Sequence, residues 1–260
     1  MIDSNTVYFV GSGPGDPELI TLKAKKLLES ADVVVYSGSL LNPRLLEYAK
    51  DGAMLHDAAL IDRIKIYEIL RDSTKQGKLA IRFHDGDPAL FSTIREQIDK
   101  LNLDGIKCKV VPGITAILGA ASSLNLELTL PGITQTLIIT RAELRTPVPE
   151  GERISNLATH GATMAFYLSV HLIRNIVEEL LKSGSYQTTT PVAVVYKATW
   201  EDEKIIVGTL ANIVEKVREA KITKTAIIIV GNVINPRSYE FSKVYDKQFT
   251  HGYRIADKSK

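Results

Sequence analysis

Short apolar runs alternate with amphipathic segments along most of the chain. The first run, at 7–10, is followed by leucines at helical spacing from residue 19 to residue 28. Further apolar runs of strand length, each separated from the next by a helical pattern, lie at 32–36, 53–55, 79–83 and 106–111. A strand-helix alternation of this kind is typical of a parallel sheet covered by helices on both faces. The first half of the chain is therefore predicted to be an α/β domain.

The pattern restarts after Leu130-Pro131-Gly132 and predicts a second α/β domain. Its apolar runs lie at 135–140, 163–168, 191–196, 204–207 and 225–230. The short link between 191–196 and 204–207 favours an antiparallel hairpin, so this second sheet is expected to be mixed. We therefore predict an N-terminal domain at 1–130, a C-terminal domain at 131–235 and a tail at 236–260, whose aromatic residues are expected to pack on the rest of the chain.

Composition narrows the class of protein without identifying it. Of the 260 residues, 45% are apolar and 24% are charged, which is ordinary for a globular chain with a real core. The net charge of +2 gives no reason to expect nucleic acid as a partner. Neither a signal peptide nor an apolar run long enough to cross a bilayer is apparent, so we expect a cytoplasmic protein without a membrane partner. The single cysteine, Cys108, excludes an intrachain disulfide.

A glycine-rich loop, Gly11-Ser12-Gly13-Pro14-Gly15-Asp16-Pro17, directly follows the first predicted strand. Loops at this edge of an α/β sheet are where ligands bind. A phosphate-binding P-loop is excluded because Gly15 is followed by Asp16 instead of Lys-Ser/Thr. A dinucleotide fingerprint is weakened because Asp16 replaces the third glycine and Ser37 stands where the second strand should end in an acid. A nicotinamide-dependent oxidoreductase therefore fits poorly, and a tight turn without a ligand stays open.

Two further turns, Asp85-Gly86-Asp87-Pro88 and Val111-Pro112-Gly113-Ile114-Thr115-Ala116, follow the fourth and fifth predicted strands. Together with the glycine loop, this ordered set resembles the tetrapyrrole (corrin/porphyrin) methylase family over about residues 7–231. The resemblance implies two α/β domains with the active site in the cleft between them. It also implies S-adenosyl-L-methionine as cofactor, S-adenosyl-L-homocysteine as product, a tetrapyrrole substrate and a homodimer.

Several other stretches look most like the members of the family that act in corrin biosynthesis; they lie at 35–43, 55–57, 130–136, 140–149, 162–165 and 191–204. Ser37 stands where the members acting on uroporphyrinogen III carry an acid, which lowers that alternative. Methylation of another precorrin position and a non-catalytic tetrapyrrole carrier stay open.

The resemblance also implies which residues form the site. It assigns the cofactor to Pro14, Asp85, Gly86, Asp87, Leu90, Thr115 and Ala116 in the first domain, and to Leu168, Ala198, Thr225 and Ala226 in the second. A helix is predicted to start at Pro88, and the alternative role of Asp87 is its N-cap. A helix is likewise predicted to start at Asn42-Pro43, with Asn42 as its N-cap.

A substrate with several carboxylates favours arginine partners. We expect substrate contacts from Ser37, Gly38, Ser39, Arg44, Arg141 and Arg145, with ordinary ion pairs or polar loops as the alternative. No catalytic residue is assigned, although Asp57 and His56 are candidates to accept a proton. The scattered histidines have no paired spacing, so no protein-bound metal is expected.

Overall fold

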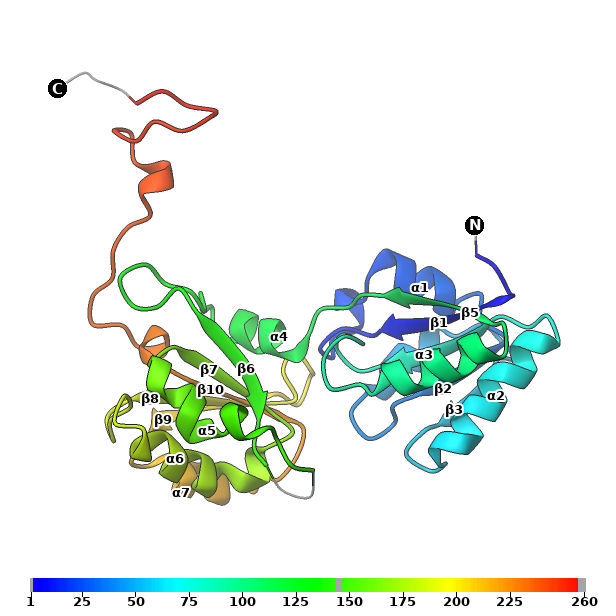
Figure 1. Ribbon diagram of the computed structural model, residues 1–260. Coiled ribbons are helices and arrows are strands. Elements are labelled where there is room, and N and C mark those ends of the chain that lie inside the picture. The colour runs from blue at the N-terminus through cyan, green and yellow to red at the C-terminus, as the bar shows by residue number, and fades with distance from the viewer. Residues whose placement is uncertain (1, 144–145, 257–260) are drawn as a thin grey trace. The chain divides into compact units, whose positions relative to one another are not determined.

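The computed structural model describes residues 2–143 and 146–256, which form two compact units (Figure 1). Unit 1 comprises the chain up to Leu124 together with Val195–Lys204. Unit 2 comprises Asn125–Val194 and the chain from Ile205 onward. The segment Val195–Lys204, which is remote in sequence from the rest of unit 1, is thus part of that unit.

Unit 1 is a five-stranded sheet in the order β3-β2-β4-β1-β5. Its strands are β1 (Thr6–Gly11), β2 (Val33–Tyr36), β3 (Met54–Asp57), β4 (Ala80–His84) and β5 (Lys107–Val111), and its α-helices are α1 (Leu22–Leu28), α2 (Arg63–Lys75), α3 (Ile94–Leu103) and α4 (Ala116–Ser123). All four strand pairings are parallel, as the strand-helix alternation predicts. The carboxyl ends of the five strands therefore meet at one edge.

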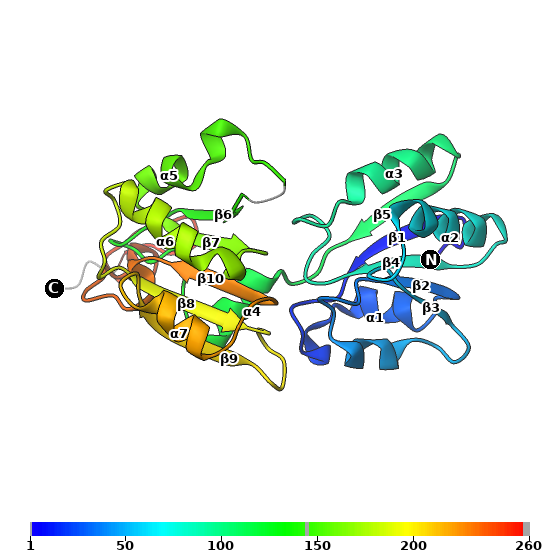
Figure 2. The same ribbon diagram turned by 90° about the horizontal axis from the view of Figure 1, so that it is seen from below.

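Helices cover both faces of this sheet because its central strands are apolar on both sides. On β1, Tyr8 and Val10 pack into a core with α1, whereas Val7 and Phe9 pack into a second core with α2 and α3. Figure 2 shows α2 and α3 together on one side of the sheet and α1 on the other. Each buried aliphatic side chain contributes about 1.5–3 kcal/mol to folding, so the two cores hold the strand ends firmly in register.

The two predicted helix starts at prolines differ in outcome. At Asn42-Pro43 a 3-10 helix begins (Pro43–Tyr48), and the Asn42 side chain accepts a hydrogen bond from the backbone N–H of Arg44. At Pro88 the prediction of a helix is wrong, because α3 begins only at Ile94. Thr93, directly before α3, has a φ of 50°, a left-handed conformation that interrupts helix growth.

Unit 2 contains the mixed sheet that the sequence predicts, in the order β6-β7-β10-β8-β9. Its strands are β6 (Leu137–Arg141), β7 (Thr163–Tyr167), β8 (Pro191–Tyr196), β9 (Lys204–Thr209) and β10 (Ala226–Val230), and its α-helices are α5 (Ile154–Leu157), α6 (Ile173–Lys182) and α7 (Ile213–Glu219). The pairing of β6 with β7 is parallel and that of β10 with β7 is antiparallel. In the described part of the chain, no helix is long and apolar enough to cross a membrane.

The tail after β10 does not pack as expected. Phe241, Tyr245 and Tyr253 are all exposed, and the main chain is tied back at Glu240, whose N–H donates to the carbonyl of Pro131. These three aromatic residues therefore leave most of their surface in solvent.

Candidate functional site

Three glycines from three strand ends pack against one another at the carboxyl edge of the unit 1 sheet. A Cβ on Gly11 would lie 2.6 Å from the carbonyl oxygen of Gly86, and a Cβ on Gly113 would lie 2.2 Å from that same oxygen. The backbone N–H of Gly13 donates to the carbonyl of Gly86, and that of Gly86 donates to the carbonyl of Gly13. Gly11 and Gly113 must therefore lack a side chain for the three turns to approach this closely.

Asp87 ties two of these turns together. Its Oδ2 accepts a hydrogen bond of 2.8 Å from the N–H of Gly113, and its Oδ1 accepts one of 2.7 Å from the N–H of Ala89. The second bond forms a local turn and does not cap a helix, because α3 starts later in the chain. The carboxylate of Asp87 thus holds the turn after β4 against the turn after β5.

The segment Val195–Lys204 packs against the glycine loop. The Trp200 Nε1–H donates to the carbonyl of Pro14 over 3.1 Å, and the backbone N–H of Asp16 donates to the Thr199 hydroxyl over 3.0 Å. A Cβ on Gly15 would lie 1.9 Å from Cδ1 of the indole. The absence of a side chain at Gly15 is therefore what allows Trp200 to sit against the loop.

Buried ionisable groups lie at the carboxyl end of β4. Burial lowers the pKa of the Arg82 guanidinium to about 10 and lowers the pKa of His84 well below its usual range. Burial also raises the pKa of the Asp85 carboxyl, while the charge of Arg82 acts in the opposite direction. His84 stacks on Phe9 with ring centroids 6.1 Å apart. These groups place a neutral imidazole and a poorly solvated carboxyl group beside the three turns.

The ends of β2 and β3 bring Asp57 next to the polar loop that follows Tyr36. Tyr36 and Asp57 are paired in register, and a Cβ on Gly38 would lie 2.2 Å from both carboxylate oxygens of Asp57. Ser37 lies beside Arg82, whose Nη1–H donates to its hydroxyl over 3.3 Å. Ser39 is exposed and His56 is half-buried. The carboxylate of Asp57 thus occupies the space above Gly38.

Seven of the predicted cofactor residues lie in unit 1 at or after the strand ends of β1, β4 and β5; they are Pro14, Asp85, Gly86, Asp87, Leu90, Thr115 and Ala116. Ala198, expected in the second domain, lies in unit 1, because it belongs to the segment that closes over the glycine loop.

In unit 2, Leu168 follows β7 and Ala226 begins β10. The antiparallel pairing of these strands places Leu168 and Ala226 at one edge of the sheet, next to Thr225. Leu168 and Thr225 each have a φ of 53°, which is unusual for residues with a side chain. Strained backbone of this kind gathers at ligand sites.

Two of the three predicted substrate arginines, Arg44 and Arg141, are engaged within the protein. Arg44 forms an exposed ion pair with Glu201. Arg141 donates to the carbonyl oxygens of Thr146 and Pro147 over 3.0 Å each, so it holds the loop that follows β6. Arg145 lies outside the described residues.

The role of Trp200 was not predicted from the sequence. Trp200 is the only tryptophan of the chain, and it lies in a polar link between two strands, where an aromatic residue has no core to join. A tryptophan at such a position could have indicated a packing role outside the core. The side chain of Asn42, predicted only as a helix cap, also donates from Nδ2 to the carbonyl of Gly15 over 2.8 Å.

The chain thus combines a parallel sheet, which carries glycine- and aspartate-rich turns at three neighbouring strand ends, with a separate mixed sheet. This combination is that of the tetrapyrrole methylases, a class of methyltransferases. The family model of the tetrapyrrole (corrin/porphyrin) methylases matches residues 6–214, and the chain belongs to this family.

Relatives within the family are similar over nearly the whole chain. The chain is 50% identical to a cobalt-precorrin-4 C(11)-methyltransferase of Methanocaldococcus jannaschii, over 99% of both proteins. It is 43% identical to the enzyme of the same name from Priestia megaterium, over 97% of this chain and 99% of the relative.

Among solved structures, a cobalt precorrin-4 methyltransferase described as a cobalamin biosynthetic enzyme superposes with a TM-score of 0.87 at 42% identity, over 90% of this chain and 97% of that one. A uroporphyrin-III C-methyl transferase from Thermus thermophilus, complexed with S-adenyl homocysteine, superposes with a TM-score of 0.74 at 27% identity, over 90% of this chain and 96% of that one.

Proposed function

We propose that this protein is an S-adenosyl-L-methionine-dependent methyltransferase of cobalamin biosynthesis that methylates C11 of cobalt-precorrin-4 or precorrin-4. The observation that carries the proposal is the 50% identity, over 99% of both chains, to a relative named for this reaction. Identity at this level, without large insertions or deletions, leaves the strand-end turns in the same framework.

The turns of unit 1 suit the cofactor. Gly86 has a left-handed φ of 59°, and a Cβ there would make ordinary contacts of 3.5 Å with the nitrogen of Ala116 and 3.6 Å with the Cα of Thr115. Small residues at such a turn let a flat nucleoside approach main-chain groups. The Asp85 carboxyl, or the turn held by Asp87, offers an acceptor for a ribose hydroxyl. Leu168, Thr225 and Ala226 of unit 2 and Ala198 of unit 1 are proposed as the remaining cofactor contacts.

The reaction requires alignment and removal of one proton. When bound, the cofactor supplies an electrophilic methyl group whose bond to sulfur breaks with both electrons staying on sulfur. The protein contributes by holding the acceptor carbon in line with that methyl group and by excluding water. No protein-bound metal is needed for such a displacement, and none forms part of the proposal.

Asp57 is the proposed proton acceptor. Its carboxylate lies over Gly38, beside the position at which Ser37 replaces the acid expected of a uroporphyrinogen III methylase. Asp57, at the end of β3, thus places a carboxylate beside the end of the neighbouring strand β2. His56 points to the opposite side of the edge strand β3, because consecutive strand residues alternate. Asp57 is therefore favoured over His56.

The residues proposed to contact the tetrapyrrole are Ser37, Gly38, Ser39, Arg44, Arg141 and Arg145. Arg44 would release the carboxylate of Glu201 and bind a substrate carboxylate in its place. The exposed ion pair with Glu201 contributes little free energy, so losing it costs little. We propose further that the protein acts as a cytoplasmic homodimer, without nucleic acid or a membrane as partner.

The proposal is tested by incubating the pure protein with methyl-labelled S-adenosyl-L-methionine and each candidate tetrapyrrole, and locating the new methyl group by NMR. Label at C11 of cobalt-precorrin-4 or precorrin-4 is the expected result, and the preferred substrate shows whether cobalt enters first. Label on uroporphyrinogen III, the substrate named for a relative at 34% identity, or at another ring position would replace the specific proposal. Absence of cofactor binding by calorimetry would remove the whole assignment.

A further inference from the structure

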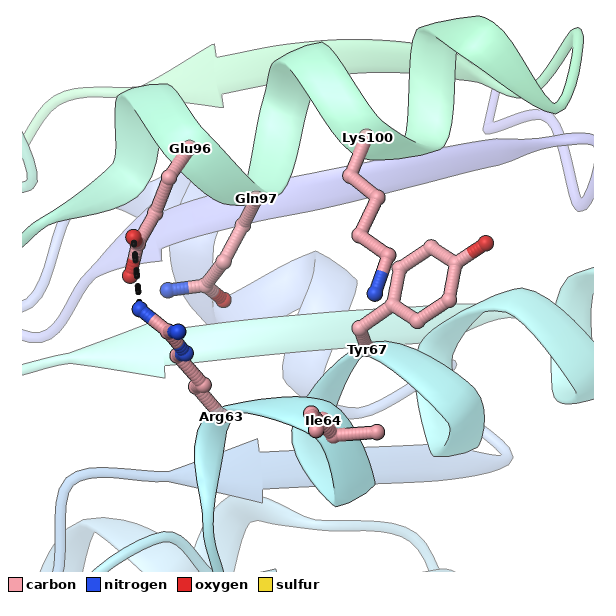
Figure 3. A pocket seen from close by; sticks show the side chains of 6 residues that line it. All are labelled: Arg63, Ile64, Tyr67, Glu96, Gln97 and Lys100. Carbon is pink, nitrogen blue, oxygen red and sulfur yellow. Dashed lines mark ion pairs between the residues drawn. The ribbon is translucent and has the colours of Figure 1, made fainter.

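A cavity of about 310 Å³ lies between α2 and α3, on the outer side of unit 1 (Figure 3). Each helix lines it with three residues at the same spacing: α2 provides Arg63, Ile64 and Tyr67, and α3 provides Glu96, Gln97 and Lys100. Cavities of this size accommodate small organic ligands. None of the six residues belongs to the proposed methyltransferase site, so ligand binding in this cavity is independent of that function.

Gln97 is the unusual residue of this cavity. Only 8% of it is exposed, and Figure 3 shows its side chain extending from α3 toward α2. Its Nε2 donates to the carbonyl of Thr93 over 3.3 Å, a long hydrogen bond that does not lock the amide in place. Its Oε1 has no hydrogen-bond partner in the described part of the chain. A buried carbonyl oxygen without a donor is costly, so this oxygen lacks an N–H or O–H group from a ligand.

The charges around Gln97 indicate what else that ligand carries. Arg63 and Glu96 face each other at 3.9 Å, a long and exposed ion pair that leaves both groups able to bind a ligand. On the other side of Gln97, the Lys100 Nζ lies 3.9 Å above the ring of Tyr67, whose hydroxyl is already bonded to Asp104. Two cations and one carboxylate therefore border the cavity together with the unpaired oxygen of Gln97.

A zwitterion satisfies this combination of groups. A ligand carboxylate would bind Lys100 and Arg63, and a ligand ammonium would donate to the Gln97 Oε1 and to Glu96. The terminal amide of glutamine turns easily about its last torsion, so its oxygen can meet a donor inside the cavity. The exposed side chain of Ile64 adds an apolar contact for a ligand side chain. We propose that the cavity between α2 and α3 binds a small α-amino acid with an apolar side chain.

L-leucine is the probe, titrated into the full-length protein and followed by calorimetry and by the side-chain amide signals of Gln97 in NMR spectra. Isocaproate, which lacks the ammonium, and isoamylamine, which lacks the carboxylate, are the matched ligands. We expect saturable binding of L-leucine and at least tenfold weaker binding of either analogue, because each loses one charge-assisted contact.

Variants locate the binding. Gln97→Leu and Lys100→Met should each weaken L-leucine binding about tenfold. Lys65→Met, which removes an exposed charge from α2 outside the cavity, should leave it unchanged. Gln97→Leu should fold at least as stably as the parent, because it removes a buried group without a partner. No saturable binding, equal binding of isocaproate, or unchanged binding by Gln97→Leu would each overturn the proposal.

Discussion

Replacing Gly15 by alanine tests how the glycine loop is built. The added Cβ would lie 1.9 Å from Cδ1 and 2.1 Å from Nε1 of Trp200, so the indole has to move. Overpacking of this kind costs about 1–3 kcal/mol, and loss of the 3.1 Å hydrogen bond from Trp200 to Pro14 adds about 1 kcal/mol. We expect Gly15→Ala to reduce the free energy of unfolding by about 2–4 kcal/mol.

Two measurements check this expectation. Because Trp200 is the only tryptophan, its fluorescence reports directly on this contact, and its emission should shift to the red as the indole becomes more solvated. Urea unfolding followed by circular dichroism gives the loss of stability. Gly151→Ala is the matched control, because a Cβ there meets nothing within 4 Å.

A double-mutant cycle separates the clash from any other effect of the new methyl group. In the background of Trp200→Ala the clash is gone, so Gly15→Ala should then cost at least about 1 kcal/mol less than it does in the parent. Unchanged stability and unchanged emission in Gly15→Ala, or equal costs in the two backgrounds, would refute the idea that Gly15 is required by the indole.

Four further substitutions test the site. Asp87→Ala should weaken cofactor binding about tenfold in calorimetry, because two backbone N–H groups lose their acceptor; unchanged affinity would remove Asp87 from the site. Asp57→Asn should lower kcat while leaving cofactor affinity unchanged, and an unchanged kcat would exclude Asp57 as the proton acceptor. Asp85→Asn should stabilise the protein at neutral pH but not in acid, because the raised pKa of Asp85 means that the folded state disfavours the ionised form; urea unfolding at both pH values decides. The lowered pKa of His84 means that the unfolded chain binds the extra proton, so stability should fall as the pH drops through 6.5. His84→Gln should flatten that part of the stability profile, and an equally steep profile would contradict the assignment.

The strands could be predicted from the sequence because a strand that is buried on both faces consists of consecutive apolar residues. Strand β8 was predicted with its observed bounds, Pro191–Tyr196, and β1 within one residue at each end. The delayed start of α3 could not be predicted from local pattern, since Pro88 suits a first helical turn as well as it suits a loop. Two features of the folded chain accompany the late start: the N–H of Gly113 donates to Asp87, which lies in a turn, and Thr93 has a left-handed φ of 50° directly before α3.

The turns at the strand ends could be predicted from the sequence, but the contacts between them could not. The three turns were found because glycine and aspartate recur after successive strands. Neither spacing nor composition indicates that Trp200 would lie against Gly15, because the two residues are far apart in the sequence and the contact depends on how the β8–β9 link folds. For the same reason the sequence could not indicate that Ala198, expected in the second domain, lies in unit 1.

The glycines of the opening loop are explained by the protein's own packing before any ligand is considered. Gly11 faces the backbone of Gly86 and Gly113, Gly13 faces the carbonyl of Leu19, and Gly15 faces the indole of Trp200. Each of these contacts leaves less than 3 Å for a Cβ, so all three positions demand glycine irrespective of what binds. A glycine-rich turn after a strand therefore does not by itself indicate a phosphate or a nucleoside. Gly86 differs, because a Cβ there would make only ordinary contacts of 3.5 Å or more; at this position the left-handed φ of 59°, and not crowding, favours glycine.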